Sequence, residues 1–469
     1  MKIIDRFGVS ENQLRALVAE GLGSGGDWCD LYFEDTVFND LLLRDGEVNS
    51  GGYHMDYGCG IRVLKGEKTG YAYSESTDYA SLLSAARAAG AIANASDAAP
   101  KSYKAASAAA GSYYPMASDW MEAEASRFVP FLKSIDEGIK ARDQRVVKVV
   151  AMLSYSVSHV MMYNSLGELT SDCRPIGSVS VQVIFRQDGR TENKSVSRSL
   201  RMGSEFIGEA LLEDIISRAV AGVDERFAAK RPKGGQMQVV MGAGASGILL
   251  HEAMGHAFEA DFNRKGQSVF ADKMGKRICR KGINILDDGT VMASRGACNY
   301  DDEGVPGQKT YMVTDGVLTS YLHDRISAEY YGVAPTGNGR RESFRYNPIP
   351  RMRATYMESG SDGTVQDLIA SVKNGIYVDQ FANGEVKIGE GDFTFYVKSG
   401  SLIENGRLTM PVKDINIIGN GPQALADIEA VAGDLKIDEG TWTCGKEQSV
   451  AVSCGIPSVL IRSLTVGGE

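Results

Sequence analysis

Hydrophobic and polar positions at the start of the chain switch between helical and strand-like spacing. Residues 10–22 and the alanine-rich residues 78–95 place apolar side chains three and four positions apart, which predicts helices. Residues 28–74, between them, alternate apolar and polar side chains in four short runs separated by Asp-Gly, Gly-Gly and Lys-Gly. We therefore predict an antiparallel meander of four strands flanked by two helices.

A second block of similar pattern follows a stretch without periodicity. Residues 96–118 are small and polar, which is typical of a linker, and residues 119–141 return to helical spacing. Alternation then predicts two hairpins with bends at residues 165–168 and 187–190, and residues 205–230 predict a further helix. The two blocks share this order of elements without a repeat of individual residues.

The pattern changes again after residues 231–235, Arg-Pro-Lys-Gly-Gly. A strand at residues 236–241, a turn of small residues and a helix come first, and short strands with glycine-rich turns fill the rest of the chain. We predict an α+β protein with α+β subdomains at 1–118 and 119–230 and a β-rich C-terminal domain at 231–469.

Composition narrows the class of protein. The 469 residues exceed the size at which single cores stop growing, and 43% hydrophobic with 23% charged residues indicates a globular chain. A net charge of −10 and the absence of a Lys/Arg run argue against nucleic-acid binding. No signal-peptide core and no run of about 18 apolar residues occurs, and seven scattered cysteines suit a reducing compartment. We expect a cytoplasmic protein that does not bind membranes.

The helix that follows residues 236–241 contains the candidate metal-binding and catalytic residues. It contains His251-Glu252-Ala253-Met254-Gly255-His256, with two of the five histidines of the chain. Imidazole is the commonest zinc ligand, and a carboxylate beside the attacking water is the usual general base of a metallohydrolase. Histidines five apart lie about 140° apart on a regular α-helix, whereas one π turn would bring both to one side. We predict a metal site with a π turn near Gly255.

A competing motif lies just before these histidines. Gly242, Gly244 and Gly247 satisfy G-x-G-x-x-G between a strand and a helix, and Asp261 lies near the position of a ribose-binding acid. A dinucleotide fold also needs a second buried parallel strand, and the residues after Glu259 do not predict one. We therefore interpret these glycines as a tight turn into the helix.

A catalytic zinc normally has three protein ligands and one open position, so a third ligand is needed. Spacing alone does not choose among the candidates, which are Glu259, Asp261, the run Asp301-Asp302-Glu303, His323, Cys444 and Cys454.

Several further segments, taken in order with the motif, resemble a known family. These are HEAMGHAFEADFNRKG, DDEG, DGVLTSYLHDR, PTGNGRRES, IGNGP, CGKEQSV and the terminal LTVGG. The chain resembles the TldD/PmbA family of metallopeptidases, and within it the TldD-type subunit, which keeps the H-E-x-x-x-H motif. The resemblance covers residues 235–469 closely and the N-terminal part more loosely.

The resemblance implies a zinc-dependent peptidase acting on small or unfolded peptides. His251, His256 and Cys444 are the ligands that it implies, with Glu252 as the motif glutamate. The family's C-G-K-(D/E)-G-Q segment has a glycine that is missing here between Glu447 and Gln448. We expect the neighbouring Lys446 to lower the pKa of the Cys444 thiol, and Cys454 to be a small buried hydrophobic residue.

A mechanism and a substrate site follow as hypotheses. Glu252 would take a proton from the attacking water and pass it to the leaving amine. Residues 335–343 are a candidate substrate-facing loop in which Asn338, Arg340 and Arg341 could contact a peptide, with an ordinary surface turn as the alternative. The β-rich region could hold an extended peptide along a sheet edge.

The resemblance also implies a dimer, either of identical chains or with a related PmbA/TldE-type subunit that lacks the motif. Two other functions stay open at this point. One is a non-catalytic zinc-containing scaffold or regulatory subunit, since the family has been labelled a modulator of DNA gyrase. The other is a metal-dependent amidase that acts on small molecules. Four protein ligands would indicate a structural metal.

Overall fold

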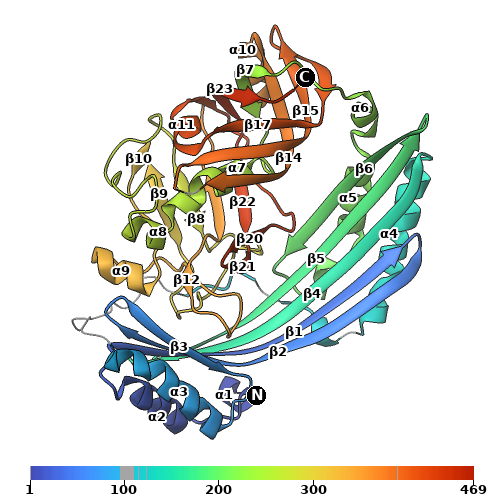
Figure 1. Ribbon diagram of the computed structural model, residues 1–469. Coiled ribbons are helices and arrows are strands. Elements are labelled where there is room, and N and C mark those ends of the chain that lie inside the picture. The colour runs from blue at the N-terminus through green and yellow to red at the C-terminus, as the bar shows by residue number, and fades with distance from the viewer. Residues whose placement is uncertain (1, 96–109, 115, 123, 388, 469) are drawn as a thin grey trace.

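The protein is an α+β protein, as predicted, in which a long curved sheet supports a β-rich C-terminal region (Figure 1). The computed structural model describes residues 2–95, 110–114, 116–122, 124–387 and 389–468. Most of the predicted linker at 96–118 lies outside the described residues. Among the described residues, no helix combines the length and the hydrophobicity needed to cross a bilayer.

Residues 28–200 contribute six strands to one antiparallel sheet. The strands are β1 (Trp28–Arg44), β2 (Glu47–Lys65), β3 (Lys68–Ser74), β4 (Val146–Asn164), β5 (Leu169–Gln187) and β6 (Arg190–Leu200). Their order in the sheet is β3-β2-β1-β4-β5-β6. β1 pairs with β4 from Asp30 opposite Asn164 to Arg44 opposite Val150, so strands from both predicted N-terminal subdomains form one continuous sheet.

Two of the turn predictions in this region are right and one is wrong. Asp45-Gly46 and Lys65-Gly66 turn between strands, but Gly51-Gly52 lies within β2. The first two predicted runs form the single continuous strand β1, so residues 28–74 form three strands instead of four. A side chain at Gly52 would collide with the Asp40 carboxylate of β1. The pair Gly51-Gly52 therefore allows the two strands to approach and does not reverse the chain.

Helices cover one face of this sheet. They are α1 (Ile3–Arg6), α2 (Glu11–Leu22), α3 (Tyr79–Asn94), α4 (Val129–Arg142), α5 (Glu209–Val220) and α6 (Val223–Ala228), with 3-10 turns η1 (Trp120–Glu122), η2 (Ala125–Phe128) and η3 (Ser204–Phe206). Ser10 begins α2 with a capping box, as its position before the apolar pattern suggests. The single helix predicted at 205–230 is wrong, because Gly222 takes a φ of 70° and separates α5 from α6.

Two apolar clusters hold these helices to the sheet. Leu31, Phe33 and Ile61 pack with α2 and α3, while Val149, Leu153 and their neighbours on β4 and β5 pack with α4 and α5. Side chains of a strand alternate between the two faces of a sheet. The intervening residues of β1 and β4, Glu34 and Ser156 among them, therefore point to the opposite face, toward the C-terminal region.

Seventeen strands lie in the described part of the C-terminal region. They are β7 (Gly235–Met241), β8 (Ile285–Asp288), β9 (Lys309–Thr314), β10 (Val317–Leu318), β11 (Gly339–Arg340), β12 (Ile349–Pro350), β13 (Ala354–Met357), β14 (Asn374–Lys387), β15 (Asp392–Glu404), β16 (Arg407–Val412), β17 (Ile415–Asn420), β18 (Ile428–Val431), β19 (Lys436–Ile437), β20 (Thr443–Lys446), β21 (Gln448–Ala451), β22 (Ser453–Ile456) and β23 (Val459–Val466). Its described helices are α7 (Gly247–Leu250), η4 (His251–Gly255), η5 (His256–Phe258), α8 (Ala260–Arg264), α9 (Arg325–Tyr331), α10 (Val365–Ser371) and α11 (Gly421–Ala426).

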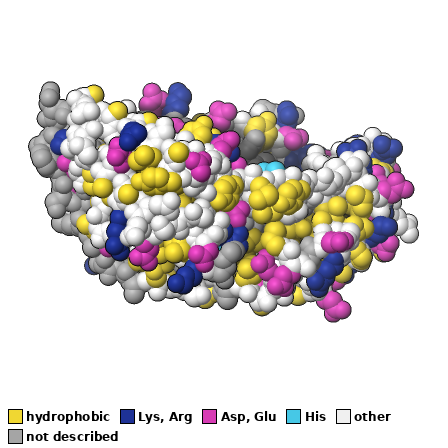
Figure 2. Space-filling view, turned by 90° about the horizontal axis from the view of Figure 1, so that it is seen from below, with side chains coloured by type: hydrophobic (Ala, Val, Ile, Leu, Met, Phe, Trp, Pro, Cys, Tyr) yellow, Lys and Arg dark blue, Asp and Glu magenta, His cyan; other side chains and the backbone are white. Residues whose placement is uncertain are grey.

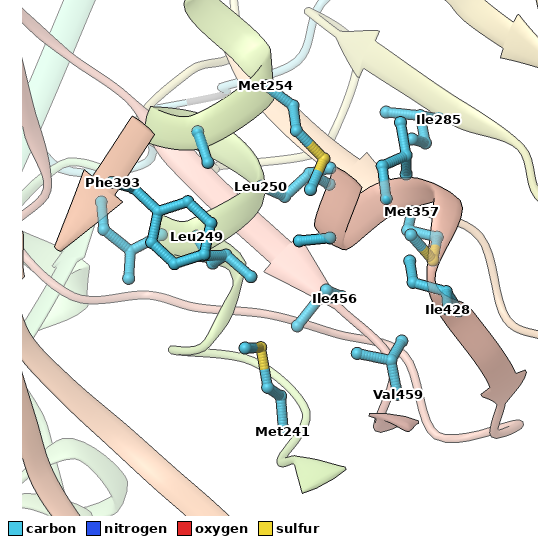
Figure 3. Packing of buried hydrophobic residues seen from close by; sticks show 14 of the residues in the cluster. Met241, Leu249, Leu250, Met254, Ile285, Met357, Phe393, Ile428, Ile456 and Val459 are labelled. Atoms are coloured by element: carbon cyan, nitrogen blue, oxygen red, sulfur yellow. The ribbon is translucent and has the colours of Figure 1, made fainter. Parts of the chain in front are cut away.

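Two larger sheets enclose the core of this region. One has the order β10-β9-β8-β13-β22-β19 and the other β14-β7-β23-β17-β15-β16, with β14 also paired to β15. Their inner side chains, including Ile285, Ile456 and Phe393, surround Leu249 and Leu250 of α7 (Figure 3). The helix that carries the histidines is thus the centre of the C-terminal core, which fixes its position on all sides.

Acidic and basic groups are mixed on one face of the molecule. On the face shown in Figure 2, the described Lys/Arg and Asp/Glu side chains form small separate groups between hydrophobic patches. On this face, charges of both signs are therefore mixed and not gathered into one block.

Glu34 joins the N-terminal sheet to the C-terminal region and is buried. Its carboxylate accepts hydrogen bonds from the Phe344 backbone N–H at 2.7 Å and from the Thr36 hydroxyl at 2.7 Å. Burial raises its pKa from 4.5 to about 7. The folded state thus holds this proton more tightly than the unfolded state, so stability from this group falls as pH rises from about 4.5 to 7.

We predict that Glu34→Gln raises stability above pH 7 by about 1–2 kcal/mol and changes it little near pH 4.5. In the variant, the amide can accept from Phe344 and donate to the Thr36 hydroxyl, whose own hydrogen is then free to be donated to Ser158. Thermal unfolding of variant and parent at pH 4.5 and pH 8 measures this difference, with the exposed Glu47→Gln as the control. An equal effect of Glu34→Gln at both pH values would contradict the raised pKa.

Candidate metal centre

The motif histidines lie on a π turn in the middle of a helix. After α7, η4 (His251–Gly255) has π geometry, and the His256 N–H donates to the His251 carbonyl, five residues back. The predicted π turn is therefore confirmed, and it contains Gly255. A side chain at Gly255 would collide with the Met352 sulfur, so the wide turn fits only with glycine in this tightly packed place.

The π turn directs both rings to the same point. The centroids of the His251 and His256 rings lie 5.3 Å apart at an interplanar angle of 78°. Cys444, 188 residues further along, reaches this point from β20, and its Sγ lies 3.3 Å from His256 Nε2. One donor atom of each residue lies within 4.8 Å of the others, and all three side chains are buried.

These three residues suit a soft divalent cation. Both ring nitrogens of His251 are buried without a hydrogen-bond partner among the described residues, although buried polar groups are normally paired. Burial disfavours a Cys444 thiolate, but the positive charge of the nearby His251 and His256 rings outweighs it and lowers the thiol pKa to about 4. Imidazole nitrogen and thiolate sulfur together are typical zinc ligands.

Glu259 orients His256 from the other side of the ring. Its Oε2 lies 2.9 Å from His256 Nδ1, which leaves Nε2 directed at the cysteine sulfur. Burial opposes charge on both groups, yet Glu259 and Cys444 raise the His256 pKa to about 10, and Lys446 and His256 lower the Glu259 pKa to about 2. A carboxylate behind a metal-binding imidazole is the usual arrangement in metal sites.

Two buried cations hold Glu259 and the cysteine hairpin together. Lys446 Nζ lies 3.0 Å from Glu259 and 2.8 Å from Asp261. The Arg351 guanidinium donates to the carbonyls of Cys444 and Gln448 at 2.7 and 2.8 Å, and its Nε lies 3.9 Å from Glu259. Sequence reasoning missed Arg351, because nothing in its neighbourhood marks it as part of a site.

The expected cause of the low Cys444 pKa was wrong. The lowering was predicted from Lys446, whose ammonium is instead directed to two carboxylates, and the two histidines cause it. Where the family's glycine is missing, β20 and β21 turn through Glu447 alone, which takes a φ of 57°. The shorter loop therefore still places Cys444 beside the histidines.

Glu252 is the most open residue of the group. Its carboxylate Oε2 lies 3.9 Å from His256 Nε2, and its side chain is 25% exposed while both histidine rings are buried. A carboxylate beside the point where the donors converge, with access to solvent, has the position that proton transfer to or from water requires.

The other candidate third ligands lie elsewhere or have other partners. His323 packs against Tyr331 with ring centroids 5.4 Å apart, and burial lowers its pKa to about 4. Asp302 pairs with Arg174 at 2.5 Å, and Glu303 pairs with Arg62 at 2.7 Å. Cys454 is buried in β22, where burial raises its thiol pKa, as expected of a small core residue.

The predicted loop at residues 335–343 is not a surface turn. Asn338 is buried and donates to Asp287 and to the Arg351 carbonyl. Arg340 donates to the carbonyls of Met352 and Ala451, and Arg341 lies 3.6 Å from Asp30. Arg340 and Arg341 nevertheless line a cavity between the N-terminal sheet and the C-terminal region, whereas Asn338 does not.

The glycines before the histidine helix have a packing role. Gly244 takes a φ of 89°, and a side chain at Gly247 would lie 2.7 Å from the backbone of Gly455 in β22. They let β7 turn into α7 and let α7 approach β22 closely, in line with the interpretation as a tight turn.

Fold and donor set together define an α+β protein with a buried candidate metal centre, and comparison with known families agrees. Three family models match, described as PmbA/TldA metallopeptidase domain 1 at residues 29–93, central domain at 119–223 and C-terminal domain at 234–468. The chain belongs to the PmbA/TldD family of metallopeptidases.

Within this family the chain is similar to TldD-type proteins. A "Metalloprotease TldD homolog" of Haemophilus influenzae is 38% identical over 94% of this chain and 93% of its own length. A "Zinc metalloprotease TldD homolog" of Saccharolobus solfataricus is 32% identical over 62% of this chain and 65% of its own length. The recognised family and TldD type are therefore confirmed.

Solved structures share the fold at lower identity. A candidate modulator of a DNA gyrase from Thermotoga maritima matches with a TM-score of 0.78 and 22% identity, over 97% of this chain and all of that one. TldE from Thermococcus kodakarensis matches with a TM-score of 0.73 and 18% identity, over 97% of this chain and all of that one.

We predict that Cys444→Ala abolishes stoichiometric zinc binding, whereas Cys454→Ala leaves it intact. Only the first variant removes a donor that lies beside the histidines, and two histidines alone hold zinc weakly. Elemental analysis of each protein after equilibration with zinc and gel filtration measures the ratio. Equal zinc in Cys444→Ala and Cys454→Ala would exclude Cys444 as a ligand.

A second prediction concerns Glu259. Glu259→Gln is expected to weaken zinc binding by about 10- to 100-fold, because it removes the carboxylate that orients His256. Competition with a chromogenic chelator measures the affinity. Asp261→Asn is the matched control, since Asp261 shares Lys446 but does not contact His256. The orienting role would be wrong if the two variants bound zinc equally well.

Proposed function

We propose that the protein is a zinc-dependent metallopeptidase that hydrolyses peptide bonds of small or unfolded peptides. The observation that supports this most directly is the convergence of His251, His256 and Cys444 within 4.8 Å, with the Glu252 carboxylate 3.9 Å from His256. Family membership adds that similar proteins are named metalloproteases, one of them a zinc metalloprotease.

His251, His256 and Cys444 would hold the ion through two nitrogens and one sulfur. Bound there, zinc would supply a Lewis acid that activates water and polarises the scissile carbonyl. The preference for thiolate at Cys444 and the carboxylate behind His256 favour a cation at this point over a neutral ligand.

Glu252 would act as the general base and then as the general acid. Its carboxylate takes a proton from the attacking water, and the resulting acid donates it to the nitrogen of the leaving amine, so the carboxylate is regenerated. Its partial exposure allows contact with both water and substrate, while Glu259 is fully buried and remains an orienting group.

A peptidase is favoured over a purely structural metal protein. A structural zinc site has four protein ligands. Within the described part of the chain, the group of residues able to hold an ion contains three members. An amidase acting on small molecules would use the same centre, and it is separated by testing unfolded peptides against small amides.

We also propose that the chain works as a dimer in the cytoplasm, with a second copy of itself or with a related subunit that lacks the motif. The similarity in fold to TldE supports a partner of the second kind. The molar mass of the purified chain in solution, with and without such a subunit, distinguishes the two arrangements.

We predict that Glu252→Gln lowers peptide hydrolysis by about 100-fold or more and leaves zinc content unchanged. Loss of a general base removes about 10² to 10⁴ in rate, while the three donors remain in place. Mass spectrometry of an unfolded peptide digested by parent and variant gives the rates. Hydrolysis by Glu252→Gln at the parental rate would remove Glu252 from the mechanism, and absence of hydrolysis by the parent would remove the peptidase.

A further inference from the structure

A cavity of about 450 Å³ lies between the six-stranded sheet and the C-terminal region. Its floor consists of residues from β1, β2, β4 and β5, and its roof includes Ser449, Val450 and Ala451 of β21. Figure 1 shows β12, β20 and β21 on the side of the C-terminal region that faces this sheet. Val450 lies opposite Cys444 in the hairpin, so the cavity and the candidate metal centre share one pair of strands.

Six arginines line this cavity against four carboxylates. Arg174 pairs with Asp302 at 2.5 Å, and Arg341 lies 3.6 Å from Asp30. The other four are Arg201, Arg295, Arg340 and Arg353, and none of their guanidinium groups has a carboxylate within 4 Å among the described residues. Asp302 still acts on Arg340 and Arg353 over a longer distance, so the positive charge that the protein balances least is that of Arg201 and Arg295.

The bonds that these four arginines do make leave N–H groups free. Arg201 donates only through Nε, to the Arg295 carbonyl, so both of its Nη atoms lack a partner among the described residues. Arg295 donates to the Trp442 carbonyl and to the Ser178 and Ser199 hydroxyls but keeps Nη2 free. Arg340 keeps Nε free. Each of these nitrogens keeps some access to solvent, since none is among the fully enclosed unpaired atoms.

The guanidinium groups are close enough to repel one another. Burial lowers the pKa of Arg295 to about 10, with Arg201 adding to the effect. Burial and the charge of Arg353 also lower the pKa of Arg340, although Asp302 opposes this. Arginine stays charged even so, which means that the lowering measures unfavourable charge in the folded protein. Several unpaired buried cations are costly unless an anion joins them.

We propose that this cavity is an anion-binding pocket that takes the C-terminal carboxylate of a peptide. Guanidinium groups bind carboxylates through paired, charge-assisted hydrogen bonds, and several free N–H groups converge here. Phe38, Met152 and Ile176 provide apolar wall beside the charges, which suits a ligand with side chains better than a free inorganic anion. The identification of the ligand as a peptide carboxylate rests on the proposed function, whereas the identification of the cavity as an anion-binding pocket does not.

The consequence for the proposed activity is selection by chain end. A peptide held by its carboxylate would extend along β21 toward the strand that carries Cys444. Peptides with a free C-terminus would then bind better than amidated ones, whatever their sequence. Selection of this kind differs from recognition of particular side chains near the scissile bond.

Calorimetric titration of the full chain tests the proposal. The protein carries Glu252→Gln so that peptides stay intact, and the probes are N-acetylated Ala-Ala-Ala-Phe, its C-terminal amide and inorganic phosphate at one ionic strength. We expect the free acid to bind about tenfold or more tightly than the amide, since hydrogen bonds to charged groups contribute that much. Equal binding of acid and amide would overturn the proposal, whether or not phosphate binds.

Arg201→Gln and Arg295→Gln, each added to this background, should reduce the preference for the acid to about threefold or less. The exposed Arg186→Gln on β5 is the matched control and should preserve it. Without ligand, Arg201→Gln should not lower the melting temperature, because it removes one hydrogen bond together with an unbalanced charge. An acid preference that persists in both folded variants would overturn the proposal. Because binding is measured without hydrolysis, a failure of this proposal can be distinguished from a failure of the proposed function.

Discussion

The site depends on one backbone hydrogen bond, from the His256 N–H to the His251 carbonyl. This bond defines the π turn, and it places two rings that a regular α-helix would separate within reach of one ion. The turn fits here because Gly255 has no side chain, and the surrounding core leaves no room for one. The core also packs α7 between two sheets. A local irregularity is therefore held by the best-packed part of the molecule, which keeps the two rings in position before any ligand binds.

Buried charges are paired differently in the candidate metal centre and in the neighbouring arginine-lined cavity. At the candidate metal centre, Glu259 is surrounded by His256, Lys446 and Arg351, so every buried charge has an opposite partner. That balance orients one imidazole and holds the cysteine hairpin in place. In the arginine-lined cavity, the protein leaves several guanidinium groups without a carboxylate. A balanced network suits a fixed scaffold, whereas unbalanced charge suits a ligand that arrives with the missing charge.

The parts of this structure that depend on neighbouring residues could be predicted from the sequence. The caps and spans of α2 and α3, the hairpin bends at 165–168 and 187–190 and the π turn all follow from spacing within a few residues. Cys444 could be selected only through the family resemblance, because 188 residues separate it from His256. Pairing of β1 with β4, the role of Arg351 and the burial of Arg340 and Arg341 were out of reach for the same reason. Local patterns specify elements, but contacts between distant segments are decided by packing that no single stretch encodes.

The segment from Gly339 to Arg353 connects the two sites. Arg340 donates to the Ala451 carbonyl on one strand of the hairpin, and Arg351 donates to the Cys444 carbonyl on the other. Both guanidinium groups hold backbone, so this short segment sets the position of the cysteine sulfur relative to the histidine rings. Because Arg340 also lines the cavity, an anion bound there would act on a group that supports the hairpin carrying Cys444. The cavity and the candidate metal centre are thus joined through two arginines and one pair of strands, and a shift of the hairpin would alter both sites together.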